Sequence, residues 1–188
     1  MKVLHIISGG DSGGAKTHVF SLLEELKNRI DVKIICLTPG VFYQEILEKD
    51  IPVELFLQKH RYDLKVIKGI VELIRKEGYQ ILHAHGARAN FIAAILKMYI
   101  NIPVVTTVHS DYRLDFTGNI YRRIVYTGLN VLSLRFLDYY IGVSENFRNM
   151  LVSRGYPREN VFTVYNGIDF DKEISFGTRE QFLKSVHI

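Results

Sequence analysis

The sequence has little cysteine and little proline: one cysteine, Cys36, and four prolines occur among its 188 residues. A single cysteine excludes a disulfide framework and a cysteine-based metal site, and Cys36 lies in an apolar segment where we expect burial. No apolar run approaches the roughly 20 residues that cross a bilayer, and nothing after Lys2 is typical of a secretory signal. With 47% apolar and 23% charged residues, the composition is typical of a globular protein with one sizeable core. We therefore expect a cytoplasmic location.

Positive and negative charges are also nearly balanced, because the formal net charge is only +4. This value permits an anionic ligand or the anionic inner face of a membrane and demands neither. No basic and aromatic interleaving and no helix-turn-helix or zinc pattern is present, so we expect no nucleic-acid partner. Tyrosines and arginines gather over 112–138. They suit an interface, an anionic acceptor or peripheral membrane contact, and equally a solvated helix face.

Strand-like and helix-like patterns alternate along the chain. Apolar runs predict strands at 2–8, 31–38, 51–57, 80–84, 103–108, 139–143 and 161–165. Helical spacing of apolar residues predicts helices at 14–29, 40–49, 63–77, 87–99, 118–137 and 145–155. About seven strands joined by helices predict an α/β fold with a doubly wound, mainly parallel, Rossmann-like sheet. The alternation is lost near the end, so we expect one domain over 1–170 and the start of a linker over 171–188.

The segment between the first strand and the first helix is rich in glycine. Gly9-Gly10-Asp11-Ser12-Gly13-Gly14 precedes Ala15-Lys16-Thr17. Glycines let a backbone approach an anion, and a helix N-terminus offers free N–H groups. The dinucleotide pattern G-x-G-x-x-G fails because residue 8 is serine, and no acidic residue ends the second strand. The P-loop pattern fails because Ala15 places Lys16 one residue late, about 100° around the helix.

A Gly-Gly pair at a helix start, with no demand on a lysine, fits this segment without repair. In this interpretation the loop is a phosphate site outside the carboxyl end of the first strand, where open α/β sheets bind ligands. The alternative is a plain strand-to-helix turn in which the glycines only form the corner.

Histidines end the fourth predicted strand, in His83-Ala84-His85-Gly86. Strand alternation puts His83 and His85 on one side of the sheet. They could form a metal pair, but no third ligand follows at suitable spacing and His5 and His18 belong to other elements, so we predict no metal. A second interpretation places His85 at the mouth of a cleft and His83 in the core. In a third, both are structural.

The fifth and sixth predicted strands also end in polar residues. His109, Ser110 and Asp111 follow the fifth, where a histidine can hydrogen-bond hydroxyls or phosphates. They cannot form a hydrolase triad, because adjacent strand residues face opposite sides, and no G-x-S-x-G elbow occurs. Ser144 follows the sixth strand, in the position of a helix N-cap.

Five short segments together resemble the N-terminal domain of a GT-B glycosyltransferase of family 4, also called glycosyl transferases group 1. They are Gly-Gly-Ala at 13–15, His-Ala-His at 83–85, Val-His at 108–109, Val-Ser-Glu at 143–145 and Val-Tyr-Asn-Gly-Ile-Asp at 164–169. The resemblance covers almost the whole chain and implies one half of a GT-B architecture, with the acceptor side over 1–170. Members of the family transfer a sugar from a nucleotide-sugar donor, retaining the anomeric configuration and without a metal. A hexosyltransferase is therefore implied.

The resemblance also implies roles for individual residues. Gly13 and Gly14 would approach the donor diphosphate, and His109 would contact the transferred sugar near the reacting centre. The implied acceptor contacts are Lys16, His85, Arg88, Ser110 and Asp111. No cofactor is implied beyond the nucleotide-sugar substrate, since N–H groups at the helix start can stabilise the departing diphosphate. The family usually has an acidic residue where this chain has Lys16.

The partners follow from what the 188 residues do not contain. The family's Glu-x7-Glu donor motif is missing, so we expect a C-terminal donor-binding domain outside this sequence, with Asn166-Gly167 leading into the hinge. The other expected partner is a sugar or lipid-linked acceptor, and the fragment is expected to be inactive alone. Two alternatives remain: a natural one-domain subunit that docks to a separate donor-binding partner, or a sugar-nucleotide epimerase-like or nucleotide-binding domain.

Overall fold

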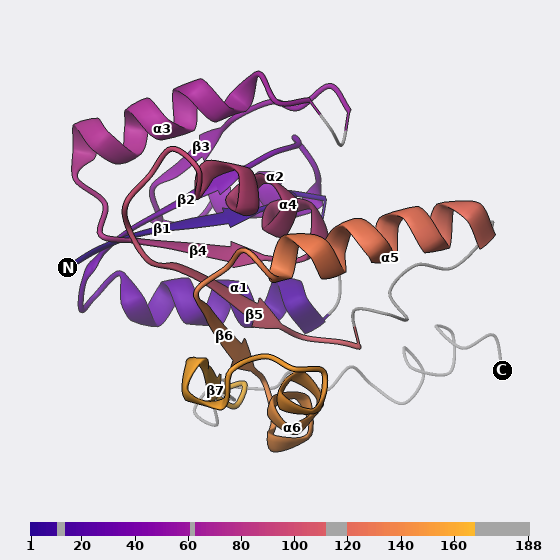
Figure 1. Ribbon diagram of the computed structural model, residues 1–188. Helices are drawn as coiled ribbons and strands as arrows, with labels where there is room; N and C mark the ends of the chain where they lie inside the picture. Colours follow the sequence, from indigo (N-terminus) through magenta and orange to yellow (C-terminus); the bar gives the residue numbers. More distant parts are fainter. Residues whose placement is uncertain (11–13, 61–62, 112–119, 168–188) are drawn as a thin grey trace, which may run out of the picture.

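The computed structural model describes residues 1–10, 14–60, 63–111 and 120–167, and in these ranges strands and helices alternate as predicted (Figure 1). The strands are β1 (Lys2–Ile7), β2 (Asp31–Cys36), β3 (Val53–Leu55), β4 (Ile81–His85), β5 (Val104–Val108), β6 (Tyr139–Gly142) and β7 (Val161–Thr163). The helices are α1 (Gly14–Leu26), α2 (Val41–Leu47), α3 (Val66–Glu77), α4 (Ala87–Leu96), α5 (Ile120–Leu134) and α6 (Glu145–Ser153), with a short 3-10 turn η1 (Arg158–Asn160) before β7.

The strands form one seven-stranded sheet in the order β3-β2-β1-β4-β5-β6-β7, and every neighbouring pair is parallel. The chain winds outward from β1 in one direction and then returns to β4 to wind in the other. The predicted doubly wound, Rossmann-like α/β sheet is confirmed. The strand order reverses between β1 and β4, and in such sheets the carboxyl ends at this point form the ligand crevice.

Helices α1 and α2 cover one face of the sheet. Val19 and Leu23 of α1 and Phe42 of α2 are fully buried in one apolar cluster with Ile7 of β1. Figure 1 shows α1 running beneath the strands on this side. Because burying one such side chain contributes about 1.5–3 kcal/mol, the cluster fixes α1 firmly against β1.

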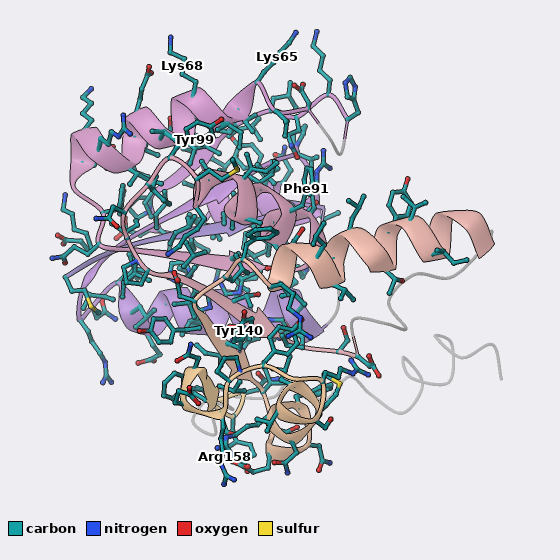
Figure 2. The ribbon with its side chains drawn as sticks, in the orientation of Figure 1. Lys65, Lys68, Phe91, Tyr99, Tyr140 and Arg158 are labelled. Carbon is teal, nitrogen blue, oxygen red and sulfur yellow. The ribbon has the colours of Figure 1, made fainter. Side chains whose placement is uncertain are left out.

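Helices α3, α4 and α5 cover the opposite face. Ile70 of α3 and Ile92 of α4 are fully buried in a second cluster with Leu4 of β1. Figure 2 shows Lys65 and Lys68 projecting outward at the start of α3, away from this cluster. The apolar side chains of α3 lie on one side of the helix and its polar side chains on the other. This is the amphipathic pattern from which the sequence predicted the helix.

A close approach between two turns explains part of the glycine-rich segment. Gly9 has φ +98°, and a Cβ there would lie 2.2 Å from the carbonyl oxygen of Thr38. A Cβ on Gly40 would lie 2.4 Å from the Cα of Gly10. The turns after β1 and β2 therefore pack backbone against backbone. The corner interpretation holds for Gly9 and Gly10, whereas a Cβ on Gly14, at the start of α1, would meet nothing within 4 Å.

The ends of α3 show how local polar groups set helix boundaries. The helix expected over 63–77 begins at Val66, because the Asp63 carboxylate accepts the backbone N–H of Lys65 in the preceding turn at 3.1 Å. Gly78 ends the helix in the left-handed conformation with φ +72°, as the sequence predicted.

The cap predicted for α6 is also confirmed, since the Ser144 hydroxyl accepts the backbone N–H of Phe147 at 3.4 Å. In the ranges that the structure describes, no helix combines the length and the apolar character needed to cross a bilayer. The linker expected over 171–188 lies outside the described residues.

Candidate functional site

A cavity of about 90 Å³ lies at the carboxyl ends of β1, β4 and β5. Its wall includes Ala15 at the start of α1, His85 at the end of β4, and His109 and Ser110 after β5. A larger hollow of about 410 Å³ lies at the opposite, amino end of the sheet. Because ligands of open α/β sheets bind at the carboxyl ends, the smaller cavity marks the candidate site.

His109 stands at the centre of this site. Its Nε2 is buried and has no hydrogen-bond partner among the described residues, and its ring meets the His18 ring edge-on, with centroids 4.8 Å apart. Burial, helped by repulsion from His18, lowers the pKa of His109 to about 4. The imidazole is therefore neutral near pH 7, with Nε2 available to a ligand.

His18 comes from the second turn of α1 and links two parts of the chain. Burial lowers its pKa, and a hydrogen bond with the Asn166 side chain acts in the opposite direction. The segment after β7 thus returns to the same site as the start of α1. Asn166 belongs to the segment expected to lead into a hinge, and the hinge itself stays a prediction.

Three histidines lie together on the α1 face of the sheet. The parallel register of β1 and β4 pairs His5 directly with His83, and His85 follows two residues later on the same face. The His5 Nδ1 and His85 Nε2 atoms are 3.0 Å apart, and the His83 Nε2 is 2.8 Å from Thr107 Oγ1. The sequence argument that no third ligand accompanies His83 and His85 is wrong, because strand pairing brings His5 to them.

These three histidines are neutral and buried. Only 7% of His83 and 2% of His85 are exposed, and His85 lines the cavity whereas His83 is not among its lining residues. Burial lowers the pKa of His5 to about 3, and burial with mutual repulsion holds the pKa values of His83 and His85 well below 6.5. Neutral imidazole is the form that donates and accepts hydrogen bonds and that ligates metals.

The glycines and the lysine of the first loop have separate places. Gly13 lies outside the described residues, and Gly14 is the first residue of α1, where an added Cβ would meet nothing within 4 Å. The Lys16 ammonium donates to both carboxylate oxygens of Glu45 on α2, at 2.8 and 2.9 Å. The Lys16 ammonium is thus paired with a carboxylate of α2.

Two further candidate acceptor residues are also held by neighbouring elements. The Arg88 Nε donates to the Gln58 side-chain carbonyl at 2.7 Å. Asp111 accepts two hydrogen bonds from the Arg154 guanidinium, both at 2.7 Å, which ties the loop after β5 to the end of α6. Ser110, between His109 and this pair, is exposed.

Several polar residues of the site were not anticipated. His18 and Thr107 contact the histidines described above. On the other face of the sheet the Thr106 hydroxyl donates to Asn90 Oδ1 at 2.7 Å, and the Asn90 amide donates to Asn130 at 3.4 Å. The available signal was a polar side chain within an otherwise apolar strand or helix pattern, since such groups need a buried partner.

Comparison with solved structures shows the same fold in several proteins of about twice the length. Anabaena Alr3699/HepE in complex with UDP has 21% identity and a TM-score of 0.69, covering 90% of this chain and 45% of that one. The lipopolysaccharide outer core galactosyltransferase WaaB has 12% identity and a TM-score of 0.69, covering 92% and 47%. UDP-GlcNAc 2-epimerase from Neisseria meningitidis bound to UDP-GlcNAc has 20% identity and a TM-score of 0.66, covering 88% and 46%.

These likenesses establish the fold alone, and transferases and an epimerase share it. The chain spans less than half the length of each of these three proteins. No curated protein sequence matches the chain. The model of the family described as Glycosyltransferase Family 4 matches residues 12–172. Because this match includes most of the sequence, the chain belongs to Glycosyltransferase Family 4, with the Rossmann-like sheet of a GT-B domain.

Proposed function

We propose that this chain is the N-terminal, acceptor-side half of a retaining, metal-independent hexosyltransferase that uses a nucleotide-sugar donor. The observation that carries the proposal is His109: a neutral imidazole whose Nε2 has no partner among the described residues, in the cavity where the strand order reverses. The family match and the Rossmann-like sheet support the same reaction class. A separate C-terminal domain would bind the nucleotide, and the fragment alone would be inactive.

The start of α1 would receive the donor diphosphate. Gly14 is its first residue and carries no side chain, and the N–H groups at a helix N-terminus are suited to bind a phosphate. Negative charge grows on the diphosphate as the sugar leaves, and these N–H groups stabilise that charge without a metal. Gly13, the other donor candidate, would add a further close approach of backbone.

His109 would hold the transferred sugar. A neutral imidazole with a proton on Nε2 donates a hydrogen bond to a sugar hydroxyl, and the edge-on His18 ring fixes the orientation of the imidazole. Protonation would place a positive charge in a buried site, and the pKa of about 4 prevents this near neutral pH. His109 is thus a neutral donor aimed at the reacting sugar.

The acceptor would approach between the start of α1 and the loop after β5. The pairs Lys16–Glu45 and Asp111–Arg154 each present hydrogen-bond donors and acceptors side by side. Sugar hydroxyls both donate and accept, so such pairs suit a glycan, a lipid-linked sugar or a small hydroxylated acceptor. Ser110 and Arg88 would add polar contacts, and His85 would support His109 from within the cavity wall.

A lipid-linked acceptor would bring the protein to the inner face of a cytoplasmic membrane. The net charge of +4 is compatible with peripheral contact there.

The first test of the proposed function is the reading frame beyond residue 188. A further domain with a Glu-x7-Glu motif supports the proposal. A stop codon with no companion donor-binding protein contradicts it.

The decisive experiment measures sugar transfer by the complete protein from a panel of nucleotide sugars. We expect His109→Ala to lower kcat by about 10²–10³-fold, the effect of removing one preorganised donor. The matched control is His60→Ala, since His60 is an exposed histidine that is not among the residues lining the cavity. Activity should persist in EDTA, and the product should keep the anomeric configuration. Inversion, or a His109→Ala variant as active as the control, would overturn the proposal.

The same reagents separate the epimerase-like and nucleotide-binding alternatives. A transferase half that lacks its donor-binding domain should bind nucleotide poorly. Titration calorimetry of this chain alone with UDP and UDP-sugars should therefore show no binding at micromolar concentrations. Tight binding of an intact nucleotide by the chain alone would favour a nucleotide-binding domain over an acceptor-side half.

A further inference from the structure

A cluster of three histidines, His5, His83 and His85, has ring nitrogens that lack hydrogen-bond partners among the described residues. One nitrogen from each lies within 4.8 Å of the other two, and all three residues are buried. The His5 Nε2 and the His85 Nδ1 have no hydrogen-bond partner among the described residues. Unpartnered polar atoms are rare at this depth, so the cluster as it stands is incomplete.

The pairing of two imidazoles determines what kind of ligand is missing. The His5 Nδ1 and the His85 Nε2 share one proton at 3.0 Å. Each neutral ring carries a single N–H, so one ring donates and the other accepts. Whichever way the shared proton lies, one of the two outer nitrogens keeps its hydrogen and the other presents a bare lone pair. If the donating ring moves the shared hydrogen to its outer nitrogen, the lone pairs of His5 Nδ1 and His85 Nε2 both become available at the same point. A Lewis acid is the class of ligand that binds two such lone pairs together.

We propose that His5, His83 and His85 form a binding site for one divalent transition-metal ion of the zinc class, which joins β1 to β4 beneath α1. Imidazole is a preferred ligand of Zn²⁺, Ni²⁺ and Cu²⁺, whereas Mg²⁺ and Ca²⁺ prefer oxygen. The site is separate from the diphosphate position proposed at the start of α1, so it adds a structural ion and no metal step in sugar transfer.

The geometry requires little rearrangement. Zinc binds imidazole nitrogen at about 2.0–2.1 Å, which puts two ligands of a tetrahedral site about 3.3 Å apart. The closest pair here is at 3.0 Å, and the widest spacing of 4.8 Å closes by rotation of the rings about their broad terminal torsions. Coordination uses lone pairs of neutral rings, each of which keeps one N–H, so no net proton is released.

A supporting partner and a ligand position towards the cavity complete the arrangement. Thr107 Oγ1 bonds the His83 Nε2 at 2.8 Å, the kind of contact that orients a metal-bound imidazole through its other nitrogen. His85 also lines the cavity beneath His109, so a water molecule can reach a fourth ligand position from that side. The site thus has three protein ligands, one orienting hydroxyl and one place for solvent.

The test is metal binding by the untagged chain after treatment with EDTA. We expect one equivalent of Zn²⁺ per chain by elemental analysis, and with Co²⁺ the visible absorption of a tetrahedral complex. His83→Gln should abolish the Co²⁺ spectrum. Thr107→Val keeps every imidazole and should weaken binding by about 10–100-fold, as expected for loss of an orienting partner. His60→Gln removes an exposed histidine and should leave both signals unchanged.

Each result of these measurements either supports or overturns the proposed metal site. Absence of stoichiometric Zn²⁺ and of the Co²⁺ spectrum in the original chain would overturn the proposal and assign the cluster to buried water. A Co²⁺ spectrum that survives in folded His83→Gln would also overturn it. If the His83 variant does not fold, X-ray absorption of the zinc-loaded original chain counts the ligands: three imidazoles support the site, and one or none excludes it. Because none of these readouts uses sugar transfer, failure here leaves the proposed reaction untouched.

Discussion

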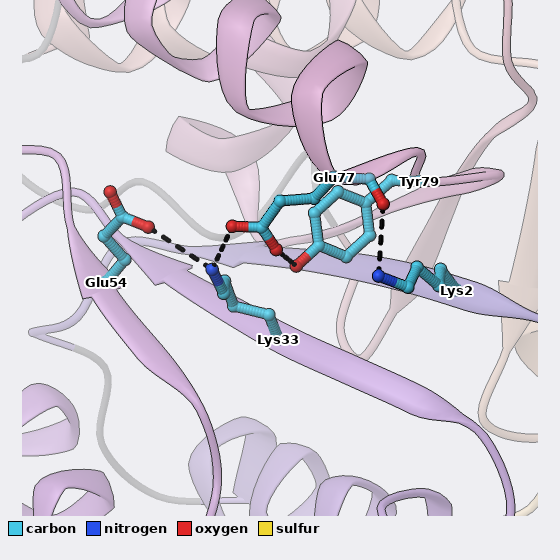
Figure 3. Close-up of polar contacts among 5 residues, drawn as sticks. All are labelled: Lys2, Lys33, Glu54, Glu77 and Tyr79. Atoms are coloured by element: carbon cyan, nitrogen blue, oxygen red, sulfur yellow. Dashed lines mark hydrogen bonds and ion pairs between the residues drawn. The ribbon is translucent and has the colours of Figure 1, made fainter.

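At the amino ends of the sheet, charged side chains around Glu77 pair with one another, whereas towards the carboxyl ends a group of histidines is neutral and largely buried. Figure 3 shows the amino-end network. Lys33 Nζ lies 2.7 Å from a Glu77 carboxylate oxygen and 3.6 Å from Glu54. The Tyr79 hydroxyl donates to the other Glu77 oxygen at 2.8 Å, and the Lys2 ammonium donates to the Glu77 backbone carbonyl at 3.1 Å. Every group in this network has a partner of complementary charge or polarity.

The pKa shifts at the two ends have different causes. The hydrogen bond from Lys33 is the largest cause that lowers the pKa of Glu77, so the carboxylate is stabilised in its charged form. Burial is the largest cause that lowers the pKa of His5 and of His109, so the charged form of each imidazole is destabilised. The network at the amino ends stabilises the fold, whereas the histidines at the carboxyl ends keep binding capacity unused by the fold.

Size alone would have selected the opposite end of the sheet as the candidate site. The hollow of about 410 Å³ at the amino ends is lined by residues of the ion-pair network, including Lys2, Lys33 and Glu77. The cavity at the carboxyl ends is about 90 Å³ and is lined by His85 and His109, whose rings each have an unpartnered nitrogen. Unsatisfied chemistry therefore identifies the site better than volume does.

The largest expected effect that separates the two ends is the loss of stability in mild acid. Below about pH 6.5 the unfolded chain takes up protons on histidine that folded His5 and His109 do not, since their folded pKa values are about 3 and 4. Stability is therefore fully present above pH 6.5 and falls as the pH decreases. Each group contributes a loss of about 1.4 kcal/mol per pH unit, or about 2 kcal/mol by pH 5. Urea unfolding in EDTA at pH 7.5 and 5.0 measures the difference.

The amino-end network provides the internal control for this measurement. Glu77 has a lowered pKa, so its contribution is present above its ordinary value of 4.5 and is lost only as the pH falls below that value. Between pH 6.5 and 5 the change in free energy of unfolding should thus come from the histidines. Equal stability at pH 7.5 and 5.0, or greater stability at pH 5.0, would contradict the neutral, buried state assigned to the imidazoles.

A smaller effect is expected where a charged pair lies at the carboxyl side of the sheet. Asp111→Asn removes one charge from the bidentate contact with Arg154. The Asp111 side chain is 30% exposed and the Arg154 side chain is 16% exposed. Hydrogen bonds to charged groups contribute more than neutral ones, so we expect a loss of about 1–2 kcal/mol in the free energy of unfolding. Denaturant unfolding with Arg154→Lys in parallel tests the bidentate geometry. An unchanged midpoint in both variants would show that the pair serves only ligand binding.

The sequence predicted what depends on local pattern and missed what depends on strand pairing. Seven strands, the helices between them and the polar strand ends followed from periodicity and turn residues. His5 was set aside as a third ligand because it belongs to another element, and only the register of β1 with β4 places it beside His83. The sequence places Lys16 one residue late for a P-loop, but its contact with Glu45, 29 residues later, required the fold.

The smallest expected loss of stability comes from a substitution at the amino ends of the sheet. Its size can be compared directly with the loss expected for the histidines in mild acid. Lys33→Met keeps the aliphatic part of the side chain and removes the ammonium that bonds Glu77. The Lys33 side chain is 20% exposed and the Glu77 side chain is 32% exposed. Partly exposed ion pairs contribute about 0.2–1 kcal/mol, so the loss should stay within that range and should shrink in 0.5 M salt. Lys68→Met is the matched control, because Lys68 is 86% exposed and lies 3.9 Å from Glu72. A Lys33→Met loss larger than the mild-acid loss would reverse the assignment, since the charged end would then contribute more to stability than the neutral end.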